Sequence, residues 1–313
     1  MSLLAAVVLV VVGLTLVLTF AGRLVWGVVG ISVGFGISAF LVSVVFVGFD
    51  PENLVVGATG SYEEVSGFAL GSIIGAAMVA LALAFGVTAL LAPMTFERVA
   101  KPVLAVPIAA TALFEGLALD GTVSRPDGII LLAGYALSVG YLVWLSRRGV
   151  DIESATKPRE NQVGSRWRAA AVMMVSLAAI VAGSELLVTG SETIIQRLGL
   201  TDTFYGMAVL ALLVSIEEVA RELPAARRGH PEISFGNVVG STLAFFLFNA
   251  GLISLVRPIP ISDTVLNFYL PVAAVTVVVM AVLMWRNKMP RWAGAILVAL
   301  YLVFLVGGYK NPS

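Results

Sequence analysis

Three scarcities limit what this 313-residue chain can be. It has no cysteine, which excludes disulfides and thiolate metal sites, and its single histidine, His230, leaves no room for a histidine-rich zinc or haem site. Charged residues make up only 12%, with 19 basic and 19 acidic side chains, so nothing in the net charge indicates nucleic-acid binding. By contrast, 59% of the residues are hydrophobic and the mean hydropathy is +1.01, a composition that requires a membrane.

Long apolar runs fill most of the chain. A membrane-crossing helix needs about 20 apolar residues, and in lipid only helices and closed barrels satisfy their own backbone polar groups. The runs are too long and unbroken for barrel strands, so we expect an all-α polytopic membrane protein. The ten expected transmembrane helices are 2–20, 25–48, 66–92, 100–119, 128–146, 168–190, 203–226, 233–256, 265–285 and 291–309.

The basic residues predict an orientation for these spans. Most of the 19 lie in loops that follow odd-numbered spans, and cytoplasmic loops are enriched in Lys and Arg. We therefore expect a plasma-membrane protein with both termini outside and a cytoplasmic linker over 147–167. That linker divides the chain into two five-helix halves, 1–146 and 168–313.

The two halves resemble each other. Leu70–Gly75 in the first half and Phe235–Gly240 in the second are both Gly-rich and small, and each lies in a span that ends near a proline. Because each half has an odd number of spans, the second copy must be inverted in the membrane. Inverted repeats that meet at the bilayer midplane are a recurring architecture of secondary transporters.

An acidic run interrupts the seventh span. Ionisable residues inside a span are costly and usually mark an ion or substrate path, so Glu217 and Glu218 are candidate cation ligands. A structural alternative exists, because Arg221 follows them at helical spacings of four and three and could neutralise them. About one hairpin later, Asn237 and Ser241 offer amide and hydroxyl oxygens, which could equally serve helix packing.

These residues bring the chain close to a known family. With Gly183–Gly190, Ser215–Glu218, Gly229–Ser241 and Arg257–Pro260, it resembles the cation/calcium exchanger superfamily, of the sodium/calcium exchanger type. The resemblance implies two inverted five-helix repeats and secondary active exchange of Ca²⁺ or another cation against Na⁺ or H⁺. The family's repeats carry Gly-Thr-Ser-x-Pro-Glu and a partner helix with Gly-Asn-x-x-Gly-Ser-x-x-x-Asn/Asp. Carried onto this chain, those motifs imply a cation site of Glu218, Glu217, Ser215, Ser241, Asn237, Ser38 and Ser72.

The motifs are incomplete here. Leu41 stands where the first repeat's glutamate is expected, and Phe245 and Ala80 replace the distal ligands of the partner helices. Ca²⁺ prefers six to eight oxygen ligands. We therefore expect weaker Ca²⁺ binding than at a complete family site, and tighter binding after restoration of Leu41 to Glu and Phe245 to Asp.

Two functions remain open at this point. The first is the cation antiporter, with small cations and the lipid bilayer as partners and no cofactor beyond the transported ions. The second is a membrane scaffold or sensor that keeps the exchanger fold without transport. We do not expect an enzyme, because the sequence has no His-Glu-x-x-His pair, no nucleophile with a base and no phosphate-binding loop. The sequence does not fix the oligomeric state.

Overall fold

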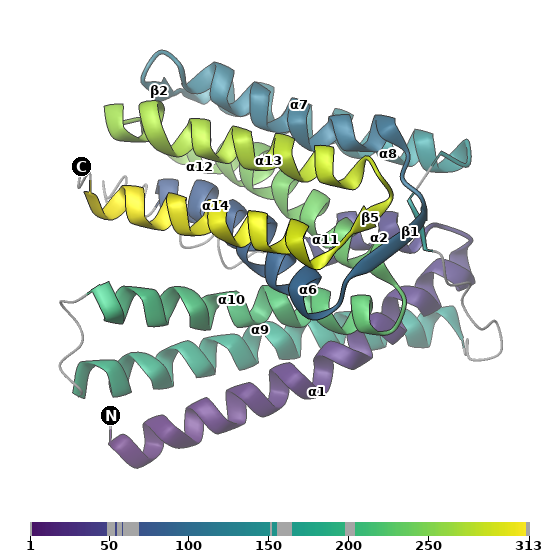
Figure 1. Cartoon of the computed structure of the whole chain (residues 1–313), viewed down its shortest axis with the longest axis horizontal. Helices are drawn as coiled ribbons and strands as arrows, with labels where there is room; N and C mark the ends of the chain where they lie inside the picture. The colour runs from purple at the N-terminus through teal and green to yellow at the C-terminus, as the bar shows by residue number, and fades with distance from the viewer. Residues whose placement is uncertain are drawn as a thin grey trace.

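The computed structural model describes residues 2–48, 54, 58, 69–150, 152–154, 165–197 and 204–310. In Figure 1 its helices run roughly along the longest axis of the molecule. The three helices α1, α9 and α10 lie together on one side, and α7, α12, α13 and α14 lie on the other (Figure 1). Between them lies α11, and every residue of this helix, Pro231–Leu243, is buried.

The first half of the chain supplies helices that are partly π-helical. They are α1 Leu3–Phe35, α2 Ala39–Val42, η1 Ser43–Val47, η2 Gly71–Gly75, α5 Ala76–Met78, η3 Val79–Ala84, α6 Phe85–Leu91, α7 Lys101–Ala118 and α8 Arg125–Arg147. The segments labelled η are π-helical, a geometry that occurs often near functional sites.

The second half follows a similar order. Its helices are α9 Arg166–Arg197, α10 Phe204–Arg227, α11 Pro231–Leu243, η5 Ala244–Asn249, α12 Ala250–Val256, η6 Val265–Tyr269, α13 Leu270–Met284 and α14 Arg291–Lys310. Seven helical stretches in the described part of the chain are long and apolar enough to cross a membrane, and Arg291–Gly307 is a shorter apolar one. In the part of the chain that the structure describes, the protein is thus an all-helical membrane protein apart from five short strands.

The expected boundary between the first two spans is wrong. We predicted an end at residue 20 and a new start at 25, whereas α1 continues without a break from Leu3 to Phe35. Arg23, which we placed in a loop, lies inside this helix with its guanidinium over the Phe20 ring. The helix ends at Gly36, whose φ of 65° is left-handed and suits a residue without a side chain.

Short strands tie the two halves together at both ends of the molecule. At one end β1 (Met94–Arg98) lies between β3 (Glu153–Ser154) and β5 (Lys288–Met289), and at the other end β2 (Thr122–Val123) pairs with β4 (Ile259–Pro260). All three pairings are antiparallel. Figure 1 shows β1 and β5 at the end opposite to β2. Both β1–β5 and β2–β4 join a strand of the first half to a strand of the second.

Glycines allow the helices of different halves to approach closely. A Cβ on Gly294 of α14 would lie 2.5 Å from the carbonyl oxygen of Gly86 on α6. A Cβ on Gly128 of α8 would lie 2.7 Å from the carbonyl oxygen of Gly251 on α12. Since real Cβ atoms do not come so close to backbone, only glycine fits at these crossings, as is common where membrane helices touch.

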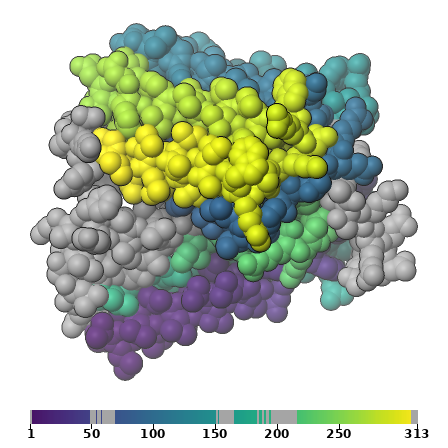
Figure 2. Space-filling model, viewed as in Figure 1, coloured from purple at the N-terminus to yellow at the C-terminus, as the bar shows by residue number. Residues whose placement is uncertain are grey.

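The outer helices present apolar side chains to their surroundings. In Figure 2, α13 and α14 cover much of the upper part of the visible face, and α1 lies along its lower edge. Residues on these helices include exposed large hydrophobic side chains, among them Leu4, Val8, Leu18, Val275, Val282, Leu302 and Val303. Such a surface would be unfavourable in water and matches the hydrocarbon interior of a bilayer.

Candidate functional site

The buried helix α11 lies directly against η1. A Cβ on Gly240 would lie 2.4 Å from the carbonyl oxygen of Val44, and one on Gly236 would lie 2.6 Å from that of Phe40. The two glycines therefore let the backbones of α2, at Phe40, and of η1, at Val44, approach α11 where any larger residue would clash. This close approach brings polar groups of η1, α10 and α11 to the same depth in the molecule.

One amide joins two acidic side chains of α10. Asn237 on α11 donates from its Nδ2 to Oε2 of Glu218 and to Oε1 of Glu222, each at 3.0 Å. The two carboxylate oxygens therefore lie within twice that distance of each other. Asn237 and Glu222 are fully buried, and Glu218 is 5% exposed. Ser234 fixes the same crossing by donating to the backbone carbonyl of Glu222 at 2.8 Å.

Arg221 completes an ionic network with these acids. Its side chain is 1% exposed, and its guanidinium donates to Oε1 of Glu217 and, at 3.4 Å, to Oε1 of Glu218. A third contact, at 3.5 Å, goes to the backbone carbonyl of Val47 in η1. The spacing of three and four residues places Glu217, Glu218 and Arg221 on one face of α10.

Several buried oxygen atoms around this network accept or donate no hydrogen bond among the described residues. They are Oγ of Ser43 on η1, Oδ1 of Asn237 and Oγ of Ser241. Thr88 lies beside the Glu222 carboxyl. Buried polar atoms are almost always paired, so a group of unpaired oxygens marks a place for a water or an ion. Carboxylate, amide and hydroxyl oxygens are the ligands that hard cations prefer.

The structure brings four of the seven predicted site residues together. Glu217, Glu218 and Asn237 belong to the bonded network, and Ser241 lies one helical turn from Asn237 on the same buried helix. The side chain of the fifth, Ser215, lies outside the part of the chain whose side chains the structure describes. The helix that carries it, α10, is the helix of the acids.

The other two predicted residues are occupied elsewhere. Ser38 caps the N-terminus of α2, where its Oγ accepts from the backbone N–H of Leu41 at 3.1 Å. Ser72 donates to the carbonyl of Ala69 at 2.9 Å within its own helix. Neither is bonded to the network of α10 and α11. The buried serine that η1 turns toward α11 is Ser43, since a Cβ on Gly236 would lie 2.6 Å from its Cβ.

Sequence reasoning missed Glu222, Thr88 and Ser43 as parts of the site. Glu222 follows Glu218 by four residues, so the helical period alone could have placed both carboxylates on one face. No sequence signal identified Thr88 or Ser43, because single hydroxyl residues in apolar helices are common and have no distinctive spacing.

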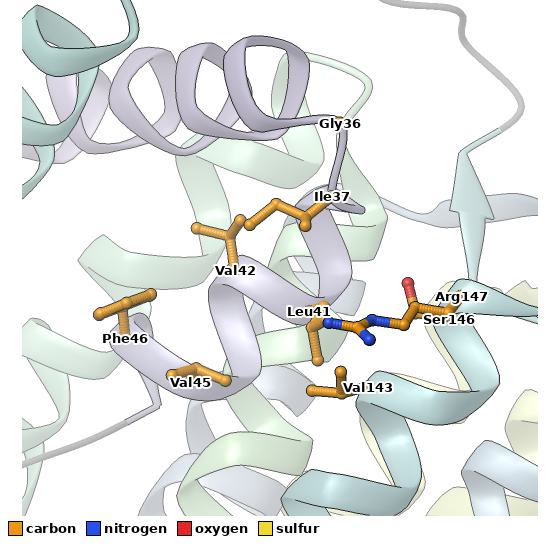
Figure 3. Close-up of a pocket in the computed structure, with 9 residues that line it drawn as sticks. All are labelled: Gly36, Ile37, Leu41, Val42, Val45, Phe46, Val143, Ser146 and Arg147. Atoms are coloured by element: carbon orange, nitrogen blue, oxygen red, sulfur yellow. The ribbon is translucent and has the colours of Figure 1, made fainter.

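Leu41 faces a different part of the molecule. It lines an apolar cavity of about 270 Å³ with Val45, Val143 and Arg147, and α8 supplies the last two (Figure 3). In Figure 3 the Arg147 side chain extends toward Leu41. A glutamate at position 41 would therefore lie beside Arg147, so the expected restoration of a ligand by Leu41→Glu no longer follows. Phe245, the other position, is fully buried in η5.

Comparison with known proteins identifies the family. The model for "Sodium/calcium exchanger protein" matches residues 5–144 and 168–310. Inner membrane protein YrbG of Escherichia coli is 26% identical over 318 residues, which cover 97% of this chain and 96% of that protein. Sodium/calcium exchanger MaX1 of Methanosarcina acetivorans is 32% identical over 135 residues, 43% of this chain and 39% of that protein.

A solved structure has the same fold. The sodium-calcium exchanger NCX_Mj superposes with a TM-score of 0.83 at 22% identity, over 100% of both chains. The sequence match extends over both halves of the chain, and the fold match extends over all of it. The chain is therefore a member of the sodium/calcium exchanger protein family.

Proposed function

We propose that this protein is a secondary active cation antiporter that carries a cation, Ca²⁺ or another, against Na⁺ or H⁺. The observation that carries the proposal is Asn237, a fully buried amide that joins the carboxylates of Glu218 and Glu222 at the crossing of α10 and α11. Intramembrane carboxylates are functional by default. Membership of the sodium/calcium exchanger protein family supports a transporter.

The cation would bind on the Asn237 side of the acidic network. Glu218, Glu222, Asn237 and Ser241 supply oxygens there, and Thr88 adds a hydroxyl from α6. Glu218 is thus not a lone carboxylate. With Glu222 beside it, the site has the charge to balance one divalent ion or two monovalent ones.

We further propose that the protein has ten membrane-spanning helices in two inverted halves. Reciprocal contacts support this arrangement. The third helix of the first half, ending in α6, packs on α14, and the corresponding helix of the second half, ending in α12, packs on α8. The glycine crossings and the strand pairs also join one element of each half in exchanged positions. The crossings are Gly86–Gly294 and Gly128–Gly251, and the strand pairs are β1–β5 and β2–β4. A two-fold relation generates such exchanged pairs.

The same reciprocity extends to helix ends. Arg125, at the start of α8, donates to the carbonyl of Val256 at the end of α12 at 3.3 Å. Arg291, at the start of α14, donates to the carbonyl of Leu90 near the end of α6 at 3.2 Å. The C-terminal end of α12 is therefore capped by an arginine of the first half, and that of α6 by an arginine of the second half. A two-fold axis between inverted repeats would require this exchange.

Ion exchange by reconstituted protein tests the function. We expect the purified protein in liposomes to exchange Ca²⁺ or another cation against a Na⁺ or H⁺ gradient. Glu218→Gln and Glu222→Gln should each abolish exchange. Glu218→Gln should leave the thermal unfolding midpoint nearly unchanged, because Arg221 keeps Glu217 as its partner. The matched control is Glu185→Gln, an exposed acid on α9, which should exchange like the wild type.

Two results would contradict the proposal. Wild-type protein that is folded and exchanges no cation under any gradient would favour a membrane scaffold or sensor. Variants at Glu218 and Glu222 that unfold at lower temperature but exchange normally would assign both acids to structure.

A further inference from the structure

The side chain of Arg221 occupies a position that oxygen ligands surround. It is the largest side chain that is fully buried among the described residues, and its guanidinium contacts the carboxylates of Glu217 and Glu218 and the carbonyl of Val47. Ser241 lies close by, because a Cβ on Gly48, the residue after Val47, would lie 2.5 Å from its backbone nitrogen. Two carboxylates with a backbone carbonyl at a helix end are also what a bound Na⁺ or Ca²⁺ uses.

We propose that Arg221 is a built-in cation, which occupies the Glu217–Glu218 position and replaces one positive charge that would otherwise come from a transported ion. A guanidinium is suited to this role because it stays protonated at every physiological pH and cannot leave the protein. This inference rests on the proposed function, since it concerns the charge that the transported cation must balance.

Charge balance defines what Arg221 does. Within the network, the acids Glu217, Glu218 and Glu222 and the one arginine, Arg221, sum to two negative charges when all are ionised. Without the arginine the same pocket would hold three, and each unbalanced charge in a low-dielectric interior is costly. Arg221 therefore lowers by one the positive charge that the cargo must bring, and it repels a cation from the Glu217 side of the network.

The geometry also explains why the acids do not converge on a common centre. No group of three acidic or imidazole side chains in the described part of the chain is arranged to hold a metal ion. Glu217 and Glu218 both point an oxygen at Arg221. A metal at this position would have to displace the guanidinium.

Replacement of Arg221 tests the inference. Arg221→Met keeps the length of the side chain and removes its charge, and Arg227→Met removes an exposed arginine at the end of the same helix as the control. We expect Arg221→Met to bind Na⁺ or Ca²⁺ about tenfold more tightly than the wild type, or better, because a like charge no longer opposes the ion at close range. Calorimetric titration with each chloride salt measures the change.

Thermal unfolding gives a second readout. In choline chloride, Arg221→Met should unfold at a lower temperature than the wild type, because Glu217 and Glu218 lose their counter-charge. NaCl or CaCl₂ at equal ionic strength should restore the midpoint of this variant, while Arg227→Met should behave like the wild type in all three salts. An unfolding midpoint of Arg221→Met that is equally low in all three salts, with cation affinity no higher than wild type, would overturn the inference.

A double variant covers the case in which Arg221→Met does not fold. Arg221→Met with Glu217→Gln removes one charge of each sign and still frees Glu218 from the guanidinium. We therefore expect this double variant to bind the cation more tightly than the wild type as well. Binding no tighter than wild type would overturn the inference. Failure of the proposed function is a separate result. If the wild type exchanges no cation, the antiporter proposal is refuted. If the wild type exchanges normally but Arg221→Met binds cations no more tightly, only the inference about Arg221 is refuted.

Discussion

Asn237 has a demanding environment for a single amide. Its Nδ2 serves two carboxylates at once, and both its neighbours Glu218 and Glu222 are buried in the middle of the helix bundle. A donor shared in this way holds the two acids in a fixed relation to each other. Its loss would leave two buried carboxylates with fewer partners, and an unsatisfied buried group costs more than the bond itself contributed.

This situation predicts the effect of removing the amide. We expect Asn237→Ala to destabilise the protein by about 1–3 kcal/mol, the typical cost of a buried polar group left without its partner. Thermal or denaturant unfolding in detergent measures the loss. Asn267→Ala is the control, because Asn267 is exposed and its Nδ2 donates to the carbonyl of Asp263 in its own turn. Equal stability of the two variants would contradict the role assigned to Asn237.

Sequence reasoning reached part of this site. Glu217, Glu218, Asn237 and Ser241 were predictable because an acidic run in an apolar span and a Gly-Asn-x-x-Gly-Ser helix are both distinctive patterns. Ser38, which its motif also predicted, caps the start of α2 in the structure, as serines just before a helix often do. Thr88 could not be predicted, since its position beside Glu222 depends on how α6 and α10 cross.

At the scale of helices, close crossings control the packing. Gly86 and Gly294 meet where α6 crosses α14, and Gly128 and Gly251 meet where α8 crosses α12. Each pair places backbone against backbone with no space for a methyl group. The helix positions behind the site therefore depend on these four glycines, as well as on the side chains that line the site.

The crossings predict which glycines tolerate alanine. Gly294→Ala should destabilise the protein by about 1–3 kcal/mol, because its Cβ would press on the carbonyl oxygen of Gly86, 2.5 Å away. Gly140→Ala on α8 is the control, since nothing lies within 4 Å of its Cβ, and alanine there should be neutral or slightly stabilising. Thermal unfolding of the two variants in detergent compares them, and equal midpoints would refute this account.

Helix boundaries can be predicted where the sequence carries clear capping residues. The start of α8 follows from Ser124 and Asp127, which form a capping box, with Pro126 in the first turn. The continuous α1 was not predictable, because Arg23 and its neighbouring glycines resemble a loop in an apolar chain. Stacking of the arginine on Phe20 and packing of α1 along α9 keep the helix intact there.

At the scale of the whole molecule, charge is distributed unevenly between the two ends. The end with β1, β3 and β5 has many basic residues in its helix ends and connections, including Arg98, Lys101, Arg147, Arg148, Arg166, Arg227, Arg286 and Lys288. The end with β2 and β4 has Arg125 and Arg257 near its strands. By the positive-inside bias, we expect the first end to face the cytoplasm.

Cysteine labelling tests this orientation directly, because the natural chain has no cysteine. Ser154→Cys on β3 should react only with reagents that reach the cytoplasm, and Ser262→Cys, exposed just after β4, only with reagents outside. Impermeant maleimide added to intact cells, with and without permeabilisation, distinguishes the two sides. Labelling of both cysteines from the same side would refute the orientation and the inverted halves.

The exchanged strand pairs have a consequence for how the protein is made. The ribosome delivers β1 and β2 long before β5 and β4 exist, so both early strands wait for partners that emerge about 140 to 190 residues later. The glycine faces of α6 and α8 wait in the same way for α14 and α12. The first half is therefore made before the strands and helices that complete its packing, and the polar cluster can form only after α10 and α11 of the second half have been made.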